Sequence, residues 1–183
     1  MTATVLRSVN NRELEEIIQL TTDCSPVPIQ SDSAFAEDLL KFIQNDENIY
    51  VVLKSVSGEL IGFCGLTPQN IAVRELNIFD AGMSDDDSRF YYEMIGIKET
   101  YRKTKAFLRL MLKSVESAKS IGISKFSSHS ITTNGINRTV QKLFHDNKVC
   151  RQIHNWMGTS HSCDYIEFTV HDKDIERIKR LLK

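Results

Sequence analysis

The stretch IGIKETYRKTKAFLRLML, residues 95–112, runs from apolar residues through a short basic segment into a second apolar pattern. Its first residues continue RFYYEMIGI (89–97), which is rich in aromatic and β-branched side chains and is typical of a strand. After the basic segment, apolar residues recur at helical spacing. Their expected buried face consists of Leu108, Met111, Leu112 and Val115. The stretch therefore predicts a strand that enters an amphipathic helix through a basic turn.

The rest of the chain alternates between the two kinds of pattern. Strands are expected at residues 2–9, at 71–79, at 123–131, in a hairpin around Gly58, and in a last pair near 149–157 and 164–170. Helices are expected to start at Asn10 or Asn11, at Asp32 or Ser33, and at Asn134 or Asn137, with others ending near Gly122 and covering 172–183. Hairpins mixed with strand–helix–strand crossovers predict an α+β fold of three layers, in which a mixed, mostly antiparallel sheet carries helices on both faces.

Length and composition favour one domain over residues 1–183, with 172–183 as an extra C-terminal helix. The formal net charge of −1 provides no general attraction for nucleic acid. The first twenty residues carry charge throughout, so we expect no secretory leader, and no apolar run reaches the roughly 18 residues that a membrane span requires. The four cysteines lack CxxC spacing and are expected to be reduced thiols. We therefore expect a cytoplasmic protein that binds neither membrane nor nucleic acid.

Two motifs resemble those of the GCN5-related N-acetyltransferase (GNAT) superfamily. In that family a hydrophobic strand ends in V-x-P-x-Y-R, a glycine-rich loop follows, and an amphipathic helix comes next; Ile97, Tyr101 and Arg102 match this pattern. The segment NRTVQKLFHDNKV (137–149) resembles the family's N-x-x-A-x-x-L-Y-x-x-x-G-F. The two motifs stand in the family's order, behind a matching hairpin, and the resemblance extends over nearly the whole chain.

The resemblance implies an N-acyltransferase that uses acetyl-CoA or another acyl-CoA as co-substrate. In the family, backbone N–H groups at the start of the central helix hold the CoA pyrophosphate, and the pantetheine arm lies along the preceding strand. The acceptor amine attacks the thioester directly, and a carboxylate removes its proton. Carried over to this sequence, the cofactor-binding residues are Ile95, Ile97, Arg102, Lys103, Thr104, Lys105, Ala106 and Asn137.

The sequence departs from the family pattern at three places. Lys105 and Phe107 occupy positions where the family has glycines, which let phosphate approach the backbone. The lysine adds a cation that suits a phosphate, whereas the phenylalanine adds only bulk. Phe144 stands where the family commonly has the tyrosine that protonates the leaving thiolate. Because a free thiol has a pKa of about 8.5, the thiolate is already a good leaving group, and the loss of this acid does not exclude catalysis.

Three residues are the catalytic candidates. Glu93 lies in the middle of the central strand among apolar neighbours, where burial would raise the pKa of its carboxyl toward the range of a general base. Tyr91, on the same strand, is a substitute acid. His129 lies on the next strand within a run of serines, and would orient an acceptor or a water molecule. Cys150, His154, His161 and Cys163 do not match a zinc spacing, so no metal is expected.

Alternatives remain open for the donor and for catalysis itself. The basic stretch between Lys98 and Lys113 would suit an acidic acyl carrier protein, as in family relatives that make N-acyl amino acids or acyl-homoserine lactones. A GNAT-like module without catalysis would also explain Lys105, Phe107 and Phe144. The expected partner is an amine, on a small molecule or a protein, and a second copy of the chain would form a homodimer.

Overall fold

The computed structural model describes residues 1–25, 32–133 and 135–183. Its strands are β1 (Thr2–Leu6), β2 (Ile49–Lys54), β3 (Leu60–Pro68), β4 (Arg89–Ile97), β5 (Lys125–Ile131), β6 (Asp146–Ile153) and β7 (Cys163–Thr169). Its α-helices are α1 (Asn11–Cys24), α2 (Ser33–Gln44), α3 (Gln69–Leu76), α4 (Ala106–Lys119), α5 (Ile136–Leu143) and α6 (Asp172–Leu182). Within these described ranges, no helix has the length and apolar character needed to cross a membrane.

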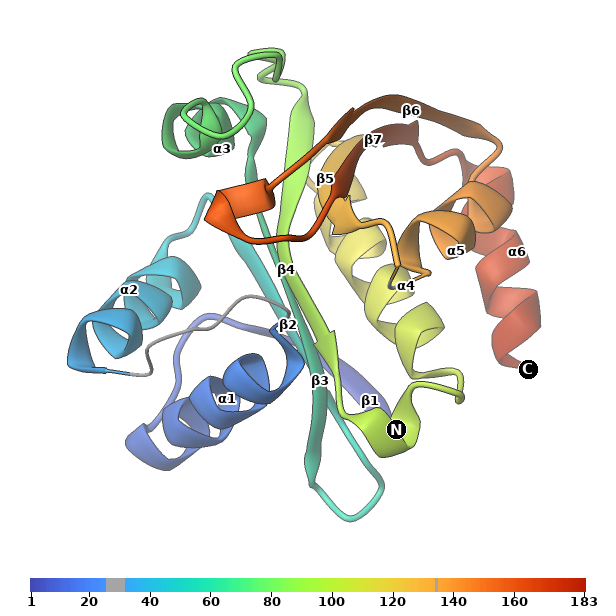
Figure 1. Ribbon diagram of the computed structural model, residues 1–183. Coiled ribbons are helices and arrows are strands. Elements are labelled where there is room, and N and C mark those ends of the chain that lie inside the picture. The colour runs from blue at the N-terminus through green and yellow to red at the C-terminus, as the bar shows by residue number, and fades with distance from the viewer. Residues whose placement is uncertain (26–31, 134) are drawn as a thin grey trace. The chain divides into compact units, whose positions relative to one another are not determined.

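The strands follow the order β1-β2-β3-β4-β5-β7-β6, and Figure 1 shows them with the helices that accompany them. The chain groups into two compact units. The first holds residues 1–66 and 94–117, and the second holds 67–93 and 118–181. Strand β4 runs through both, so each unit is described by itself. The expected α+β fold with a mixed sheet is confirmed, while the assignment of residues 1–183 to one domain stays a prediction.

The first unit is an antiparallel sheet built around a tight hairpin. Strand β2 pairs with β1 on one side and β3 on the other, and Gly58 turns the β2–β3 hairpin with a φ of 87°, as expected. The second half of β4 lies beside β3, where the backbone N–H of Lys98 donates to the carbonyl of Ile61 at 2.9 Å. This end of β4 leads through the 3₁₀ turn Glu99–Tyr101 into the basic segment before α4.

Helices cover both faces of this unit's sheet. Helices α1 and α2 pack on one face through an apolar core of Ile17, Leu20, Leu39, Ile43, Tyr50, Val52, Leu60 and Phe63 (Figure 1). Helix α4 lies against the other face, because a Cβ added at Gly62 would meet the side chain of Leu110 at 3.0 Å. Asn10 caps α1 by accepting from the N–H of Glu13 at 2.9 Å, and Asp32 caps α2, which confirms both expected helix starts.

The second unit combines a parallel strand pair with an antiparallel hairpin. Strand β4 pairs in parallel with β5 over Arg89–Tyr92, and the last five residues of β4 extend beyond this register. Strand β7 lies antiparallel to both β5 and β6. On one face α3 packs through Ala72 against Tyr91 and Tyr165. The other face carries a stack of the aromatic side chains of Tyr92, Phe126, Phe144 and Phe168.

Four expectations about secondary structure need correction. Residues 71–79 do not form a strand, because the buried or half-buried positions 69, 72, 73 and 76 repeat at helical spacing and Pro68 stands just before them. The first strand ends at Leu6, and the last pair covers Asp146–Ile153 and Cys163–Thr169. On α4 the buried face is turned slightly from the expected one, since Leu110 and Val115 are buried while Leu108 is half-buried.

Helix α5 begins at Ile136, one residue before the segment 137–149 that resembles the family motif. Its N-cap is Gly135, which has a φ of 75°, while Asn134 lies outside the described residues. Asn137 is therefore inside the first turn and does not cap the helix. Phe144 ends α5 and stacks on Phe168 at 4.9 Å, so it is a core aromatic residue.

Candidate active site

The basic segment between β4 and α4 is open to solvent in the first unit. The side chains of Arg102, Lys103, Thr104 and Lys105 are exposed, and Phe107 is half-buried. Arg102 donates from Nε to the carbonyl of Ile97 at 3.0 Å, which ties the segment back to the end of β4. The two lysines extend from a turn whose backbone is held in place, so their charges remain available to an anion.

The start of α4 has unused hydrogen-bond donors. The hydroxyl of Thr104 donates to the carbonyl of Tyr101 at 2.7 Å and accepts from the N–H of Ala106 at 3.2 Å. The next two N–H groups, those of Phe107 and Leu108, have no acceptor among the described residues. A helix start with free donors and a partial positive charge is suited to a phosphate group. The residues present therefore fit the pyrophosphate of CoA.

Glu93 lies in β4 just beyond the last residue that pairs with β5. Its side chain keeps access to solvent, although protein atoms surround the carboxylate on most sides. This desolvation, and secondarily the negative charge of Glu75 on α3, raises the pKa of Glu93 to about 7. A carboxylate with such a pKa can accept a proton near neutral pH and release it again.

Tyr91 and His129 lie together in a buried hydrogen-bonded network. The hydroxyl of Tyr91 is 3.0 Å from Nδ1 of His129, and Nε2 of His129 is 3.0 Å from Oδ2 of Asp80. Arg151 donates from Nε to both carboxylate oxygens of Asp80, at 2.8 and 3.0 Å. Burial alone would raise the pKa of Asp80, but the hydrogen bonds from Arg151 and His129 outweigh it and hold this pKa below its usual value.

The direction of each hydrogen bond in the network follows from these charges. Burial lowers the pKa of His129 to about 4, so the imidazole is neutral near pH 7. Asp80 is ionised and can only accept, which requires Nε2 of His129 to carry the proton. Nδ1 must then accept from the hydroxyl of Tyr91. Burial, with a smaller contribution from the charge of Glu93, also raises the pKa of Tyr91, so its phenol stays protonated.

Local structure explains how this network is assembled. A register shift between Val149 and Arg151 places Arg151 opposite Tyr165, and its guanidinium lies 4.3 Å from the centre of the tyrosine ring. Trp156, in the β6–β7 turn, stacks on His129 with ring centres 4.2 Å apart. The imidazole of His129, on strand β5, thus contacts residues of the segment after α3 and of the β6–β7 hairpin.

Asn137 has one satisfied and one unsatisfied group. Its side-chain nitrogen donates to Asp164 at 2.7 Å. Its Oδ1 atom is buried and has no partner among the described residues. A buried acceptor without a donor is costly, so this oxygen is suited to an N–H or O–H group of a bound molecule.

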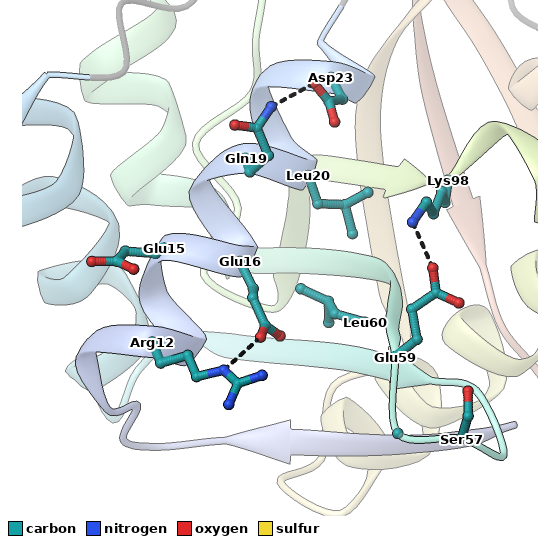
Figure 2. Close-up of a pocket in the computed structure, with 11 residues that line it drawn as sticks. Arg12, Glu15, Glu16, Gln19, Leu20, Asp23, Ser57, Glu59, Leu60 and Lys98 are labelled. Atoms are coloured by element: carbon teal, nitrogen blue, oxygen red, sulfur yellow. Dashed lines mark hydrogen bonds and ion pairs between the residues drawn. The ribbon is translucent and has the colours of Figure 1, made fainter.

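The first unit also contains an open recess of about 680 Å³ between α1 and the β2–β3 hairpin, drawn in Figure 2. Leu20 and Leu60 lie among charged residues, four of which form two ion pairs: Glu59 with Lys98 at 2.5 Å and Glu16 with Arg12 at 3.2 Å (Figure 2). None of the residues predicted for the active site lines this recess.

A sequence model of the acetyltransferase (GNAT) family matches residues 14–146, which is most of the chain. This protein belongs to the GNAT family. The match confirms the resemblance seen in the two motifs and the predicted enzyme class, an acyltransferase. No curated protein matches the chain by sequence.

Solved structures of GNAT enzymes share the fold. Aminoglycoside 6'-acetyltransferase type Ii has a TM-score of 0.67 and 18% identity, over 92% of this chain and 97% of that one. NAA60 of Arabidopsis thaliana, in complex with acetyl-CoA, has a TM-score of 0.64 and 19% identity, over 92% and 99%. The ribosomal-protein-S18-alanine N-acetyltransferase of Escherichia coli has a TM-score of 0.64 and 9% identity, over 92% and 94%. The predicted acyl-CoA co-substrate agrees with this family.

Sequence reasoning missed several residues of the second unit that the structure brings to the GNAT site candidates. Asp80, Arg151 and Trp156 surround His129, and Glu75 raises the pKa of Glu93. Asp80 directly follows residues 71–79, which were predicted as a strand, and no pattern in the sequence indicated its role. Trp156 is the single tryptophan of the chain, and it lies within residues 149–157, which were predicted as a strand, whereas the structure places it in the β6–β7 turn.

Proposed function

We propose that this GNAT protein is an N-acetyltransferase that moves the acetyl group of acetyl-CoA to a primary amine, with Glu93 as the general base. The observation that carries the proposal is the carboxylate of Glu93, which is accessible to solvent and has a pKa of about 7. An amine that enters as an ammonium ion must lose a proton before it can attack. A base with a pKa near the working pH accepts that proton most effectively.

Each unit offers groups suited to the co-substrate. In the first unit, the N–H groups of Phe107 and Leu108 would hold the pyrophosphate, with Lys103 and Lys105 adding positive charge. The edge of β4 at Ile95 would bind the pantetheine arm, whereas the carbonyl of Ile97 already accepts from Arg102. In the second unit, the unsatisfied oxygen of Asn137 is an acceptor. Of the two residues at glycine positions, Lys105 is exposed and adds positive charge, while Phe107 is half-buried.

Glu93 accounts for the proton transfer that precedes attack. Bound acetyl-CoA would supply an acyl carbon activated by its thioester. Glu93 takes one proton from the ammonium ion, the neutral amine bonds to this carbon as the carbon–sulfur bond breaks, and the second proton that the nitrogen releases passes to solvent. The sulfur leaves as a thiolate, which needs little help because its conjugate acid has a pKa of about 8.5. This agrees with Phe144 being a core residue rather than an acid.

We assign Tyr91 and His129 a positioning role. Both side chains are buried, and the hydroxyl of Tyr91 donates a hydrogen bond to His129 rather than toward solvent. Tyr91 lies two residues before Glu93 in β4, so the network that anchors its side chain also fixes the strand that carries the base. A neutral phenol with a raised pKa is a poor proton donor to a thiolate.

The experiment is a transfer assay with purified protein, acetyl-CoA and a panel of primary amines, followed by release of CoA thiol and by mass spectrometry of the amine. We expect CoA release that depends on the amine and a product that carries an acetyl group. If the acetyl group is transferred only from acetylated acyl carrier protein, that protein and not acetyl-CoA is the donor. Binding of acetyl-CoA without transfer to any amine would contradict the proposal.

A further inference from the structure

The first turn of α5, in the second unit, carries a buried amide that is only half satisfied. Asn137 is 6% exposed, and its side-chain nitrogen donates to Oδ2 of Asp164 on β7 at 2.7 Å. Its Oδ1 atom is buried and has no donor among the described residues. Because a buried acceptor without a donor is unfavourable, something must hold Oδ1 in this position.

The register of β7 explains why Asp164 meets this turn of the helix. Side chains at even spacing share one face of a strand, so Asp164 and Phe168 lie on the same face of β7. Phe168 stacks on Phe144 at the end of α5, while Asp164 contacts Asn137 near its start. Helix α5 therefore lies along β7, and the strand holds the carboxylate of Asp164 directly against the amide of Asn137.

Two further side chains contact the carboxylate of Asp164. Gln152, opposite Asp164 on β6, donates to its Oδ1 atom at 3.3 Å, and the hydroxyl of Thr132 lies 3.5 Å from the same atom. Both contacts are to Oδ1, which leaves Oδ2 for Asn137. A carboxylate oxygen only accepts hydrogen bonds, so it must face the nitrogen of the Asn137 amide and not its oxygen. Asp164 therefore fixes the orientation of this amide.

We infer that Asp164 is a positioning residue for the co-substrate, because it orients the Asn137 amide so that Oδ1 accepts a hydrogen bond from an amide N–H of bound acyl-CoA. This inference rests on the proposed function and adds a residue that does not itself contact the co-substrate. The pantetheine arm of acyl-CoA carries two amide N–H groups, and either would satisfy Oδ1. Without Asp164 the amide could turn its nitrogen toward that N–H, which would bring two donors together.

The first test measures the Kd of acetyl-CoA by calorimetric titration, and kcat at saturating acetyl-CoA, in Asp164→Ala and Asp164→Asn. Asp164→Ala should raise Kd about 5- to 10-fold with kcat nearly unchanged, because one oriented hydrogen bond to the co-substrate is lost. Asp164→Asn should stay within about threefold of the wild type, because its amide oxygen still accepts from Asn137. If Asp164→Ala does not fold, Asp164→Ser, whose side chain is also shorter, takes its place.

The matched control is Gln152→Ala. It removes the hydrogen bond to the other carboxylate oxygen of Asp164 and leaves the one to Asn137 in place, so its Kd should equal that of the wild type.

A second test uses two CoA analogues in which an ester oxygen replaces one or the other pantetheine N–H. In the wild type and in Asp164→Asn, one analogue should bind about 5- to 10-fold more weakly than CoA. In Asn137→Ala and Asp164→Ala, the difference between CoA and that analogue should shrink to less than about twofold, because the acceptor is absent or turned away.

The outcomes separate this inference from the proposed function. If Asp164→Ala binds acetyl-CoA as the wild type does, or if Gln152→Ala loses as much affinity, the inference is overturned, while acetyl transfer by the wild type keeps the proposed function. Analogues that discriminate equally in the wild type and in Asn137→Ala would also overturn it. A wild type that does not bind acetyl-CoA would overturn the proposed function and this inference together.

Discussion

Glu59 and Glu93 are two glutamates on or beside central strands, and their surroundings give them opposite properties. Glu59 lies at the recess in the first unit, where its hydrogen bond to Lys98 holds its pKa below the usual value. Among the described residues, none places a cation beside Glu93, and desolvation together with Glu75 raises its pKa to about 7. The recess is lined by two ion pairs, Glu16 with Arg12 and Glu59 with Lys98, whereas the charge that acts on Glu93 is that of another carboxylate. Unbalanced charge, more than the size of a cavity, therefore identifies the candidate base.

The largest expected effect is the loss of activity in Glu93→Gln, for which Glu59→Gln is the comparison. Glu93→Gln should lower kcat for acetyl transfer by about 100-fold or more at pH 8, with little change in acetyl-CoA binding, because a positioned base is lost. Glu59→Gln should stay within about twofold, because exposed ion pairs contribute little. Steady-state kinetics and calorimetric titration with acetyl-CoA measure both. Equal losses in the two variants would remove the distinction between the sites.

A second prediction concerns the network beside Glu93. His129 has a pKa of about 4 in the folded chain and about 6.5 unfolded, so the unfolded state binds a proton first as pH falls. The contribution of neutral His129 to the free energy of unfolding is therefore full above pH 6.5. It falls by about 3 kcal/mol between pH 6.5 and pH 4. The raised pKa of Glu93 gives the opposite trend in this range, but it is common to both proteins. Urea unfolding should therefore show the loss as a difference between the wild type and His129→Gln that changes by about 3 kcal/mol across this window. The exposed His145→Gln should behave as the wild type; a loss that persists in His129→Gln would mean that another group titrates.

A third prediction tests the anion-binding segment of the first unit. Lys105→Glu should raise KM for acetyl-CoA roughly 10-fold with kcat nearly unchanged, because it places a negative charge where a phosphate is expected. The difference from the wild type should shrink at high salt. Lys173→Glu reverses an exposed charge on α6 and is the control. An unchanged KM in Lys105→Glu would show that the pyrophosphate binds elsewhere.

The smallest expected effect isolates the contribution of Glu75. In Glu75→Gln the pKa of Glu93 should fall below 7, since a neighbouring negative charge no longer opposes ionisation, yet remain above that of an ordinary glutamate because desolvation is the larger cause. The acid limb of the kcat/KM profile should move to lower pH accordingly. A limb that stays in place would assign the whole shift to burial.

The fold was predictable to a large extent, because its strands and helices carry strong local patterns. The β2–β3 hairpin, the caps Asn10 and Asp32, and the strand at 89–97 each have a cause within a few residues of sequence. Residues 71–79 were misread because their apolar residues fit both periods, and the packing of Ala72 against Tyr91 and Tyr165 decides for a helix.

The site was predictable only in part. The apolar neighbours of Glu93 pointed to a raised pKa, but the charge of Glu75 arrives from another element. The surroundings of His129 depend on Asp80, which is 49 residues away in sequence, on Arg151, which is 71 residues from Asp80, and on Trp156. No local pattern encodes such contacts, because they form only when the β6–β7 hairpin packs against the segment after α3.

The most direct test of the central claim is kcat/KM for acetyl transfer between pH 5 and pH 9, measured side by side in the wild type and Glu93→Gln. A carboxylate base with a pKa of about 7 predicts wild-type activity that falls about tenfold per unit below pH 7. In Glu93→Gln that limb should be absent and the residual rate low. A wild-type profile without a limb near 7, or one that survives in Glu93→Gln, would contradict the assignment of Glu93 as the base.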